Sequence, residues 1–264
     1  MKKYFVIGNP INHSLSPVIH NYWFKQNKID AVYDKKLIKN NDEIKDLIKK
    51  IRSQEISGLN VTVPLKNVVV PFLDRLTSEA SATNSVNTIS FEGQEVVGHN
   101  TDVAGFELAI RHKKFDVNGK NVLIIGAGGV VTSIIYSLKK MSPKKIYLTN
   151  RTPKNAEKIK KIFQDLNILE WGEVEDFDMI INATSVGLNS NEKIDLNFDH
   201  LGSGKFFYDV IYSPRETLFL KDAKKHGNKV ENGKMMFIYQ AHQAFFIWNS
   251  LLPKIDEKVL ELIE

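Results

Sequence analysis

The chain has 264 residues, of which 42% are apolar and 25% charged, as expected of a globular protein with one large or two modest domains. It contains no cysteine, which excludes disulfides, thiolate metal sites and thiol catalysis. The net charge of +5 comes from lysines that are scattered along the chain, so no nucleic-acid partner is expected. No stretch approaches the roughly 18 to 20 apolar residues of a membrane span, so no membrane partner is expected either.

The N-terminal apolar run reads as a first strand at residues 4–7, because it stops at Gly8 and is too short for a signal peptide. We therefore expect a cytoplasmic protein. Ser16 suits a helix N-cap and Pro17 the first helical position, which predicts a helix over residues 16–26. Further along, the patterns predict a strand at 31–37, helices at 42–51 and 69–76, and hairpin strands at 85–91 and 95–98.

The stretch LNVTVPLK, residues 59–66, alternates apolar residues with other types, which is typical of a strand. We predict that its apolar side chains anchor the strand and that its first two polar ones face a cleft, with Leu59, Val61 and Val63 on one side and Asn60 and Thr62 on the other. Pro64 has no N–H for a central ladder and is expected to end the strand. The alternation alone therefore does not set the direction of Lys66.

The second half of the chain begins with a predicted helix at 103–111 and a continuous apolar strand at 121–125, as in a parallel sheet covered on both faces. A helix at 132–140 follows, then strands at 145–149, 179–183, 206–210 and 229–230, a helix at 236–248 and a last amphipathic helix after Pro253. The alternation of strands and helices predicts an α/β protein. Two domains fit best, one comprising residues 1–102 and 234–264 and the other residues 103–233.

A glycine-rich loop lies directly between the strand at 121–125 and the helix at 132–140. Its residues are Gly126, Ala127, Gly128, Gly129 and Val130. Glycines at this place let the backbone turn tightly and approach a pyrophosphate, which the helix N-terminus then holds. We favour this interpretation over a plain strand-to-helix turn, and it predicts a Rossmann-type dinucleotide-binding domain. Val131 stands where a small residue usually permits close helix packing.

The next strand ends in Asn150, Arg151 and Thr152, about 24 residues after Gly126. An NAD site usually has an acidic residue here for the ribose 2′-hydroxyl. Asparagine, arginine and threonine suit a 2′-phosphate instead, with Arg151 as its charge partner. The sequence therefore favours NADP over NAD.

Two other nucleotide enzymes share single features of this region. Tyr136 and Lys140 match the Tyr-x-x-x-Lys pair of short-chain dehydrogenases, but they lie on the helix after the glycine loop, whose later turns run away from the cofactor. A methyltransferase could also use the loop, yet Asn150 and Arg151 suit no part of its methyl donor. Neither alternative is favoured.

Several amides and hydroxyls stand at the ends of predicted elements in the first domain. Ser14 and Ser16 lie where a helix begins, a place that suits both an N-cap and a carboxylate ligand. The others form a set with one cation and one anion: Asn60, Thr62, Lys66, Asn87 and Asp102. Such a set suits a small polyhydroxylated molecule, whose hydroxyls need paired donors and acceptors.

Motifs spread over nearly the whole chain are similar to those of the shikimate dehydrogenase family. In chain order they are GNPINHSLSP at 8–17, NVTVPLK at 60–66, VNT at 86–88, NTD at 100–102, the glycine loop, NRT at 150–152, NATS at 182–185, DVIY at 209–212 and Gln240-Ala241. The resemblance implies NADP-linked interconversion of shikimate and 3-dehydroshikimate, in the route to chorismate and the aromatic amino acids. It also implies a substrate domain, a Rossmann domain with NADP(H), and a cleft between the two.

The resemblance further implies a role for each matching residue. Ser14, Ser16 and Tyr212 should hold the substrate carboxylate, and Asn60, Thr62, Asn87, Asp102 and Gln240 the rest of the pocket. Asn150, Arg151 and Thr152 should hold the adenosine phosphate, and Thr184 and Gly233 lie toward the nicotinamide. The family usually has Gly-x-Gly-Met where this chain has Gly233-Lys234-Met235-Met236, so Met235 is a departure beside the cofactor. We expect no metal, and a monomer or homodimer.

Lys66 and Asp102 are the predicted catalytic residues, because alcohol oxidation requires a group that takes the hydroxyl proton. Free lysine is mostly protonated at neutral pH, and a neighbouring carboxylate favours its charged form. The two are therefore best treated as a coupled pair. Two alternatives stay open. One is a quinate/shikimate dehydrogenase that also uses NAD, but such relatives tend to have an acidic residue where this chain has Thr152. The other is a non-catalytic nucleotide-dependent sensor, and the presence of both Lys66 and Asp102 argues against it.

Overall fold

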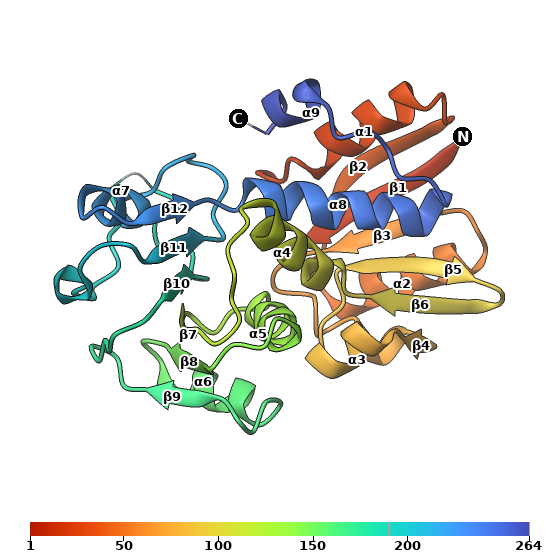
Figure 1. Ribbon diagram of the computed structural model, residues 1–264. Helices are drawn as coiled ribbons and strands as arrows, with labels where there is room; N and C mark the ends of the chain where they lie inside the picture. The colour runs from red at the N-terminus through yellow and green to blue at the C-terminus, as the bar shows by residue number, and fades with distance from the viewer. Residues whose placement is uncertain (190, 264) are drawn as a thin grey trace. The chain divides into compact units, whose positions relative to one another are not determined.

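The computed structural model describes residues 1–189 and 191–263, and the chain forms two compact units (Figure 1). Unit 1 comprises Met1–Phe106 and Ile238–Glu264, and unit 2 comprises Glu107–Phe237. Both passages between the units run inside helices, α4 (Thr101–His112) and α8 (Lys234–Asn249). The sequence placed its domain limits slightly earlier, at the starts of these helices.

Unit 1 contains a six-stranded mixed sheet in the order β2-β1-β3-β5-β6-β4. Its strands are β1 (Lys2–Gly8), β2 (Ala31–Leu37), β3 (Gly58–Val61), β4 (Arg75–Leu76), β5 (Thr88–Glu92) and β6 (Glu95–His99). β1 pairs in parallel with β2 and β3, whereas β5 runs antiparallel to β3 and β6. The β5–β6 hairpin turns at Gly93, whose φ of +64° suits a residue without a side chain. The predicted hairpin is confirmed.

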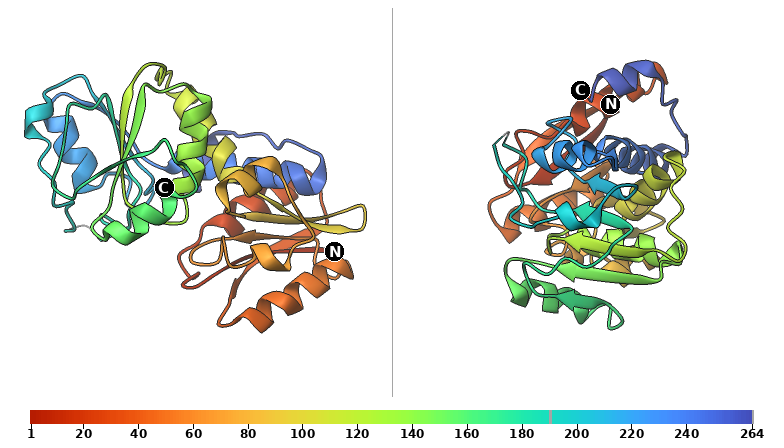
Figure 2. Two further views of the ribbon diagram at one scale, coloured as in Figure 1. Left: turned by 90° about the horizontal axis from the view of Figure 1, so that it is seen from below. Right: turned by 60° about the vertical axis from the view of Figure 1, so that its left-hand side comes forward.

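Helices cover both faces of this sheet (Figure 2). α2 (Asn41–Arg52) begins at Asn40, whose side chain accepts from the backbone N–H groups of Asp42 and Glu43, and its apolar side packs on residues such as Ile7 and Leu59. The opposite face carries an aromatic cluster contributed by β1, α1 (Ser16–Gln26) and α8, with Tyr4 against Phe24 and Trp248 at 5.2 and 4.8 Å. Short elements complete the unit: η1 (Val70–Phe72), α3 (Ser78–Thr83) and α9 (Glu257–Glu261).

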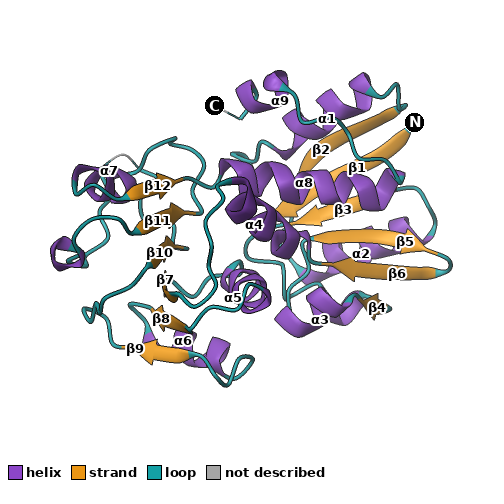
Figure 3. Ribbon diagram, in the orientation of Figure 1, coloured by secondary structure: helices purple, strands orange, loops and turns teal. Residues whose placement is uncertain are grey.

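Unit 2 is a six-stranded, wholly parallel sheet in the order β12-β11-β10-β7-β8-β9 (Figure 3). Its elements are β7 (Asn121–Ile125), α5 (Val131–Lys140), β8 (Lys145–Thr149), α6 (Pro153–Lys160), β9 (Asn167–Leu169), β10 (Met179–Asn182), η2 (Asp199–Leu201), β11 (Phe206–Asp209), α7 (Leu218–Lys225) and β12 (Lys229–Glu231). This is the doubly wound order of a dinucleotide-binding domain, in which the strand order reverses between β7 and β10. The predicted Rossmann-type fold is confirmed.

Three local predictions were wrong. Residues 69–76 form a single 3₁₀ turn and then β4, not a helix, because Pro71 and the β-branched residues before it disfavour continued helix. Ser16 is the first residue of α1 rather than its N-cap, which is Leu15 without a side-chain cap. The strand at 59–66 ends at Val61, so Val63 is 56% exposed and anchors nothing. Pro64, as predicted, lies beyond the strand.

Within the part of the chain that the structure describes, no helix is long and apolar enough to cross a membrane.

Candidate functional site

Lys66, Asn87 and Asp102 come together in unit 1 through the pairing of β3, β5 and β6. Asn87 immediately precedes β5, where its N–H donates to the carbonyl of His99 and its own carbonyl accepts from Val61. The carbonyl of Lys66 accepts from the N–H of Val86 at 2.8 Å. The register of the three strands therefore fixes the backbone beneath all three side chains.

Asp102 is held by contacts on both of its carboxylate oxygens. Oδ2 forms an ion pair with the Lys66 ammonium, and Oδ1 accepts from the Asn87 amide at 3.0 Å. Its backbone N–H donates to Asn100 Oδ1 at 3.1 Å, which caps the first turn of α4. The Lys66 and Asp102 side chains are only 12% and 8% exposed. A carboxylate in the first turn is also favoured by the helix dipole.

Asn60 is buried in a network of hydrogen bonds rather than facing open space. Its amide N–H groups donate to the carbonyl of Asn87 at 3.0 Å and to Thr88 Oγ1 at 2.9 Å. Its Oδ1 accepts from the Tyr33 hydroxyl at 2.7 Å. Both donors of Asn60 are thus in use, and only one acceptor position remains for a ligand.

Tyr33 links this network to the start of α1, and sequence reasoning missed it. Burial raises the pKa of Tyr33 well above its ordinary value, opposed by a hydrogen bond with Ser16. Ser14 Oγ in turn lies 3.2 Å from Ser16 Oγ. An unbroken series of polar contacts therefore runs from Ser14 to Asp102. Tyr33 lies in an ordinary alternating strand, so nothing local in the sequence distinguishes it.

The other two predicted substrate residues of unit 1 lie at the edge of this network. Gln240, on α8, has its Oε1 3.5 Å from the Asn87 amide nitrogen. Thr62 follows β3, where its backbone N–H donates to the carbonyl of Ile7 at 2.9 Å, and its side chain is half-buried. Seven predicted residues of unit 1 thus form one connected set, with Thr62 beside it. The remaining one, Tyr212, belongs to unit 2.

The glycine loop of unit 2 has the local geometry that a dinucleotide requires. It spans residues 126–130 between β7 and α5 and lies at the carboxyl end of the sheet, where β7 and β10 are neighbours. Gly126 has φ +108°, and a Cβ there would lie 2.7 Å from the Thr184 methyl. At Gly128 a Cβ would meet nothing closer than 3.8 Å. The backbone at Gly128 is therefore open to a close-approaching phosphate, so the loop fits the pyrophosphate of a dinucleotide.

Asn150, Arg151 and Thr152 follow β8 at the same edge of the sheet. The Asn150 amide donates to the carbonyl of Thr152 at 2.8 Å, which holds the turn. Arg151 is exposed, and its guanidinium has no hydrogen bond or ion pair to any residue in 1–189 or 191–263. A free guanidinium beside the strand end fits a phosphate group.

Thr184, Tyr212 and Gly233 lie on the segments that follow β10, β11 and β12. Thr184 donates from its N–H and its hydroxyl to Asn182 Oδ1, at 3.0 and 2.7 Å. The Tyr212 ring stacks on Phe237 with centroids 4.6 Å apart. A Cβ on Gly233 would lie 2.1 Å from the carbonyl oxygen of Val210, so glycine is required there. Met235, the departure noted in the sequence, is buried in the first turn of α8.

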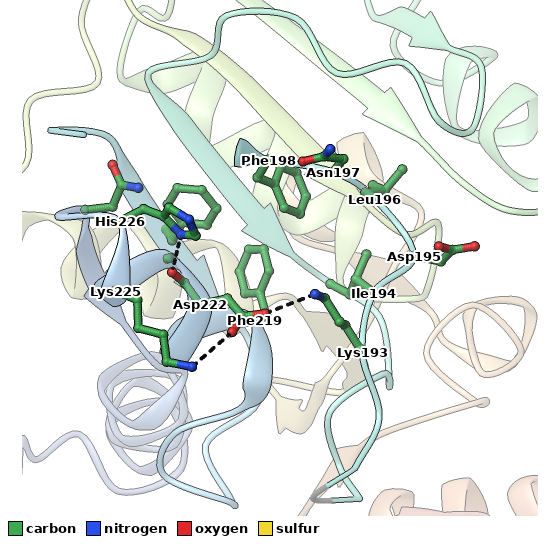
Figure 4. Close-up of a pocket in the computed structure, with 13 residues that line it drawn as sticks. Lys193, Ile194, Asp195, Leu196, Asn197, Phe198, Phe219, Asp222, Lys225 and His226 are labelled. Carbon is green, nitrogen blue, oxygen red and sulfur yellow. Dashed lines mark hydrogen bonds and ion pairs between the residues drawn. The ribbon is translucent and has the colours of Figure 1, made fainter. Parts of the chain in front are cut away.

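A cavity of about 700 Å³ in unit 2 contains none of the predicted site residues (Figure 4). Its apolar wall, including Phe207 and Phe219, belongs to the core of the unit. On its rim Lys193 and Lys225 both approach the Asp222 carboxylate, at 3.3 and 3.8 Å. Both cations are therefore already paired with the Asp222 carboxylate. No three acidic or histidine side chains among the described residues could hold a metal ion.

Two family models match the chain, one in each unit. Residues 6–89 match the shikimate dehydrogenase substrate binding domain, and residues 107–198 match shikimate / quinate 5-dehydrogenase. Over 265 residues the chain is 53% identical to a shikimate dehydrogenase (NADP(+)) of Pelagibacter ubique, with 100% of both chains covered.

Solved structures share the fold over the full length of the chain. The crystal structure of shikimate dehydrogenase from Aquifex aeolicus has a TM-score of 0.90 and 35% identity, covering 100% of this chain and 97% of that one. The Thermus thermophilus shikimate 5-dehydrogenase, solved in complex with NADP(H) and shikimate, has a TM-score of 0.89 and 28% identity, covering 100% and 98%. Both likenesses extend across the two units.

Proposed function

The chain belongs to the shikimate dehydrogenase family, and we propose that it catalyses the reversible NADP-dependent reduction of 3-dehydroshikimate to shikimate. It is thus an oxidoreductase acting on a secondary alcohol. The observation that carries the proposal is the Lys66–Asp102 pair, which lies in a buried set of amides and hydroxyls within the unit that matches a substrate binding domain.

We assign the proton transfer to Lys66 and Asp102. NADP, when bound, accepts the hydride in the oxidising direction and its reduced form supplies it in the other. The protein must then take or give the proton of the hydroxyl. The ion pair keeps the Lys66 ammonium beside a fixed carboxylate. When the lysine gives a proton to substrate it becomes neutral and the Asp102 carboxylate loses its cation, which favours the return of a proton to the pair. Lys66 and Asp102 act as one coupled acid–base group.

The hydrogen-bond inventory of unit 1 limits how substrate can be held. Because both N–H groups of Asn60 are already donated, we infer that Asn60 accepts a hydrogen bond from a substrate hydroxyl and donates none. Ser14 and Ser16, near the N-terminus of α1, offer hydroxyl donors for the substrate carboxylate. Thr62, Asn87 and Gln240 complete the unit 1 part of the pocket in this proposal.

We assign NADP to the carboxyl edge of the unit 2 sheet. The open backbone at Gly128 supports a pyrophosphate site, and the unpaired guanidinium of Arg151 supports a contact with the 2′-phosphate. Thr184 and Gly233 then border the nicotinamide half. On this basis unit 1 is the substrate domain and unit 2 the cofactor domain.

The test is oxidation of shikimate with NADP, followed by NADPH absorbance, against parallel reactions with NAD and with quinate. We expect turnover with shikimate and NADP at a kcat/KM at least tenfold above every other combination. Comparable rates with NAD or quinate would instead identify a dual-cofactor quinate/shikimate dehydrogenase. Absence of turnover with all four combinations would contradict the proposal and favour a nucleotide sensor.

A further inference from the structure

Asp209, the last residue of β11, is a buried carboxylate that the proposed reaction does not use. It is 0% exposed. Oδ1 accepts from the N–H of Ile211 and from the Asn182 amide, each at 3.0 Å, and Oδ2 accepts from the Thr217 hydroxyl at 2.7 Å. All three donors are neutral, and burial raises the pKa of Asp209 to about 6, against the effect of these hydrogen bonds. A buried carboxylate without a cation is costly, which points to a specific role.

One of these hydrogen bonds leads to the glycine loop. Asn182 donates to Asp209, and its oxygen accepts both the N–H and the hydroxyl of Thr184. The Asn182 amide also donates to the carbonyl of Val186 at 3.1 Å, which closes the turn after β10. The Thr184 methyl lies only 2.7 Å from the position that a Cβ on Gly126 would take. The orientation of the Asn182 amide therefore sets the position of Thr184 beside Gly126.

A second hydrogen bond leads to the other two cofactor-side segments. The N–H of Ile211 donates to Asp209, and the carbonyl of Ile211 accepts from the N–H of Gly233 at 3.0 Å. Tyr212 is the next residue. The turn after β11 and the start of α8 are thus tied to the same carboxylate that orients Asn182.

We propose that Asp209 is a positioning residue for the nicotinamide half of the NADP site, because its carboxylate is hydrogen-bonded to the segments that carry Thr184 and Tyr212 and, through Ile211, is linked to Gly233. This inference rests on the proposed function. Asp209 touches neither substrate nor cofactor in this account and acts through Asn182 and Ile211. We expect Asp209 not to affect the position of Arg151, because Arg151 follows β8, which lies on the other side of β7 from β10 and β11.

The decisive comparison is between two ligands that share the adenosine half. NADPH contacts both halves of the site, whereas adenosine 2′,5′-bisphosphate contacts only the half assigned to Arg151. For Asp209→Asn, which keeps the shape and removes the charge, we expect at least a tenfold rise in the Kd of NADPH by fluorescence titration. The Kd of adenosine 2′,5′-bisphosphate should change less than twofold.

Asp178→Asn is the matched control. Asp178 immediately precedes β10 at the opposite edge of the same sheet, where its carboxylate accepts from the N–H of Asn121 at 2.9 Å. We expect both ligands to bind this variant as they bind the wild-type protein. If Asp209→Asn weakened both ligands equally, or neither, Asp209 would be only a structural residue and the proposal would be overturned.

Thr217→Val gives a milder test if Asp209→Asn does not fold. It removes one of the three donors, and we expect about a threefold weaker binding of NADPH alone; unchanged NADPH binding would overturn the proposal. The proposed function can fail separately. If Asp209→Asn shows the contrast between the two ligands but the wild-type protein does not oxidise shikimate, the reaction is contradicted and the positioning role is not. If the wild-type protein is active but Asp209→Asn shows no contrast, the positioning role is contradicted and the reaction is not.

Discussion

Lys66 and Asp102 form an ion pair whose side chains are only 12% and 8% exposed, although 36 residues separate them in the chain. The second carboxylate oxygen of Asp102 is held by Asn87. Buried pairs gain little net stability, because the desolvation of two charges offsets their attraction. A role in proton transfer therefore explains the buried pair better than a contribution to the stability of the fold.

Lys66→Ala should lower kcat by roughly 10² to 10⁴-fold, the usual contribution of a positioned acid–base group. Steady-state oxidation of shikimate with NADP measures this. Lys50→Ala is a suitable control, because Lys50 forms an exposed pair with Asp46 on α2 and should leave kcat unchanged. Near-normal turnover by Lys66→Ala would remove the lysine from the mechanism.

Arg151→Ala should weaken NADPH binding by about 10- to 100-fold, the range expected for losing a charge-assisted hydrogen bond to phosphate. NADH lacks the 2′-phosphate, so its Kd should change little. Titrating both nucleotides measures the contrast, and Lys154→Ala on α6 controls for loss of a nearby positive charge. An equal loss for the two nucleotides would rule out a role for Arg151 at the 2′-phosphate.

Tyr33→Phe should raise the KM for shikimate more than the KM for NADP, because Asn60 Oδ1 loses its hydrogen-bond donor. The variant should also lose about 1–3 kcal/mol of unfolding free energy for the unpaired buried group. Tyr4→Phe is the control, since that hydroxyl contacts Asn249, at 3.5 Å, and Ser57, and neither belongs to the series of contacts from Ser14 to Asp102. Matching kinetics for the two variants would show that Tyr33 has no role in ordering the pocket.

His20→Phe should make the protein less sensitive to acid. His20 is fully buried among aromatic rings, stacked on Tyr33 at 4.4 Å, and neither ring nitrogen has a hydrogen-bond partner in the described structure. Burial lowers the pKa of His20 from 6.5 to about 3. Below pH 6.5 the unfolded chain takes up a proton that the folded protein does not, so wild-type stability falls as pH falls toward 3.

The His20→Phe variant lacks this proton linkage. Relative to wild type it should gain about 2 kcal/mol between pH 8 and pH 5. Urea unfolding at the two pH values measures the difference, and His13→Phe, on the surface, should show no such gain. A pH-independent difference between His20→Phe and wild type would contradict the assigned burial.

Much of the fold could be predicted because strand and helix periods are local signals. The strand at Asn121–Ile125 and the helix at Ser16–Gln26 were predicted with their observed bounds or nearly so. Short elements such as α3 and β9 were missed, since six or three residues carry too little periodicity. The helix prediction for residues 69–76 was wrong because Pro71 interrupts the apolar run on which it rested.

Part of the candidate site could also be predicted from the sequence. The polar residues at strand ends, the glycine loop and Arg151 could be identified there, because each motif is contiguous and its chemistry depends on residue type. By itself the sequence determined an α/β chain with a dinucleotide loop and a polar set containing one lysine and one aspartate.

Only the tertiary structure decided which of these polar groups are already satisfied. It showed that both N–H groups of Asn60 are used, that Tyr33 connects Ser16 to Asn60, and that Asp209 ties together three loops. These hydrogen bonds join side chains that are distant in the chain, such as Asn182 and Asp209, which strand register brings opposite each other. Register depends on how the whole sheet packs, and no local pattern encodes it.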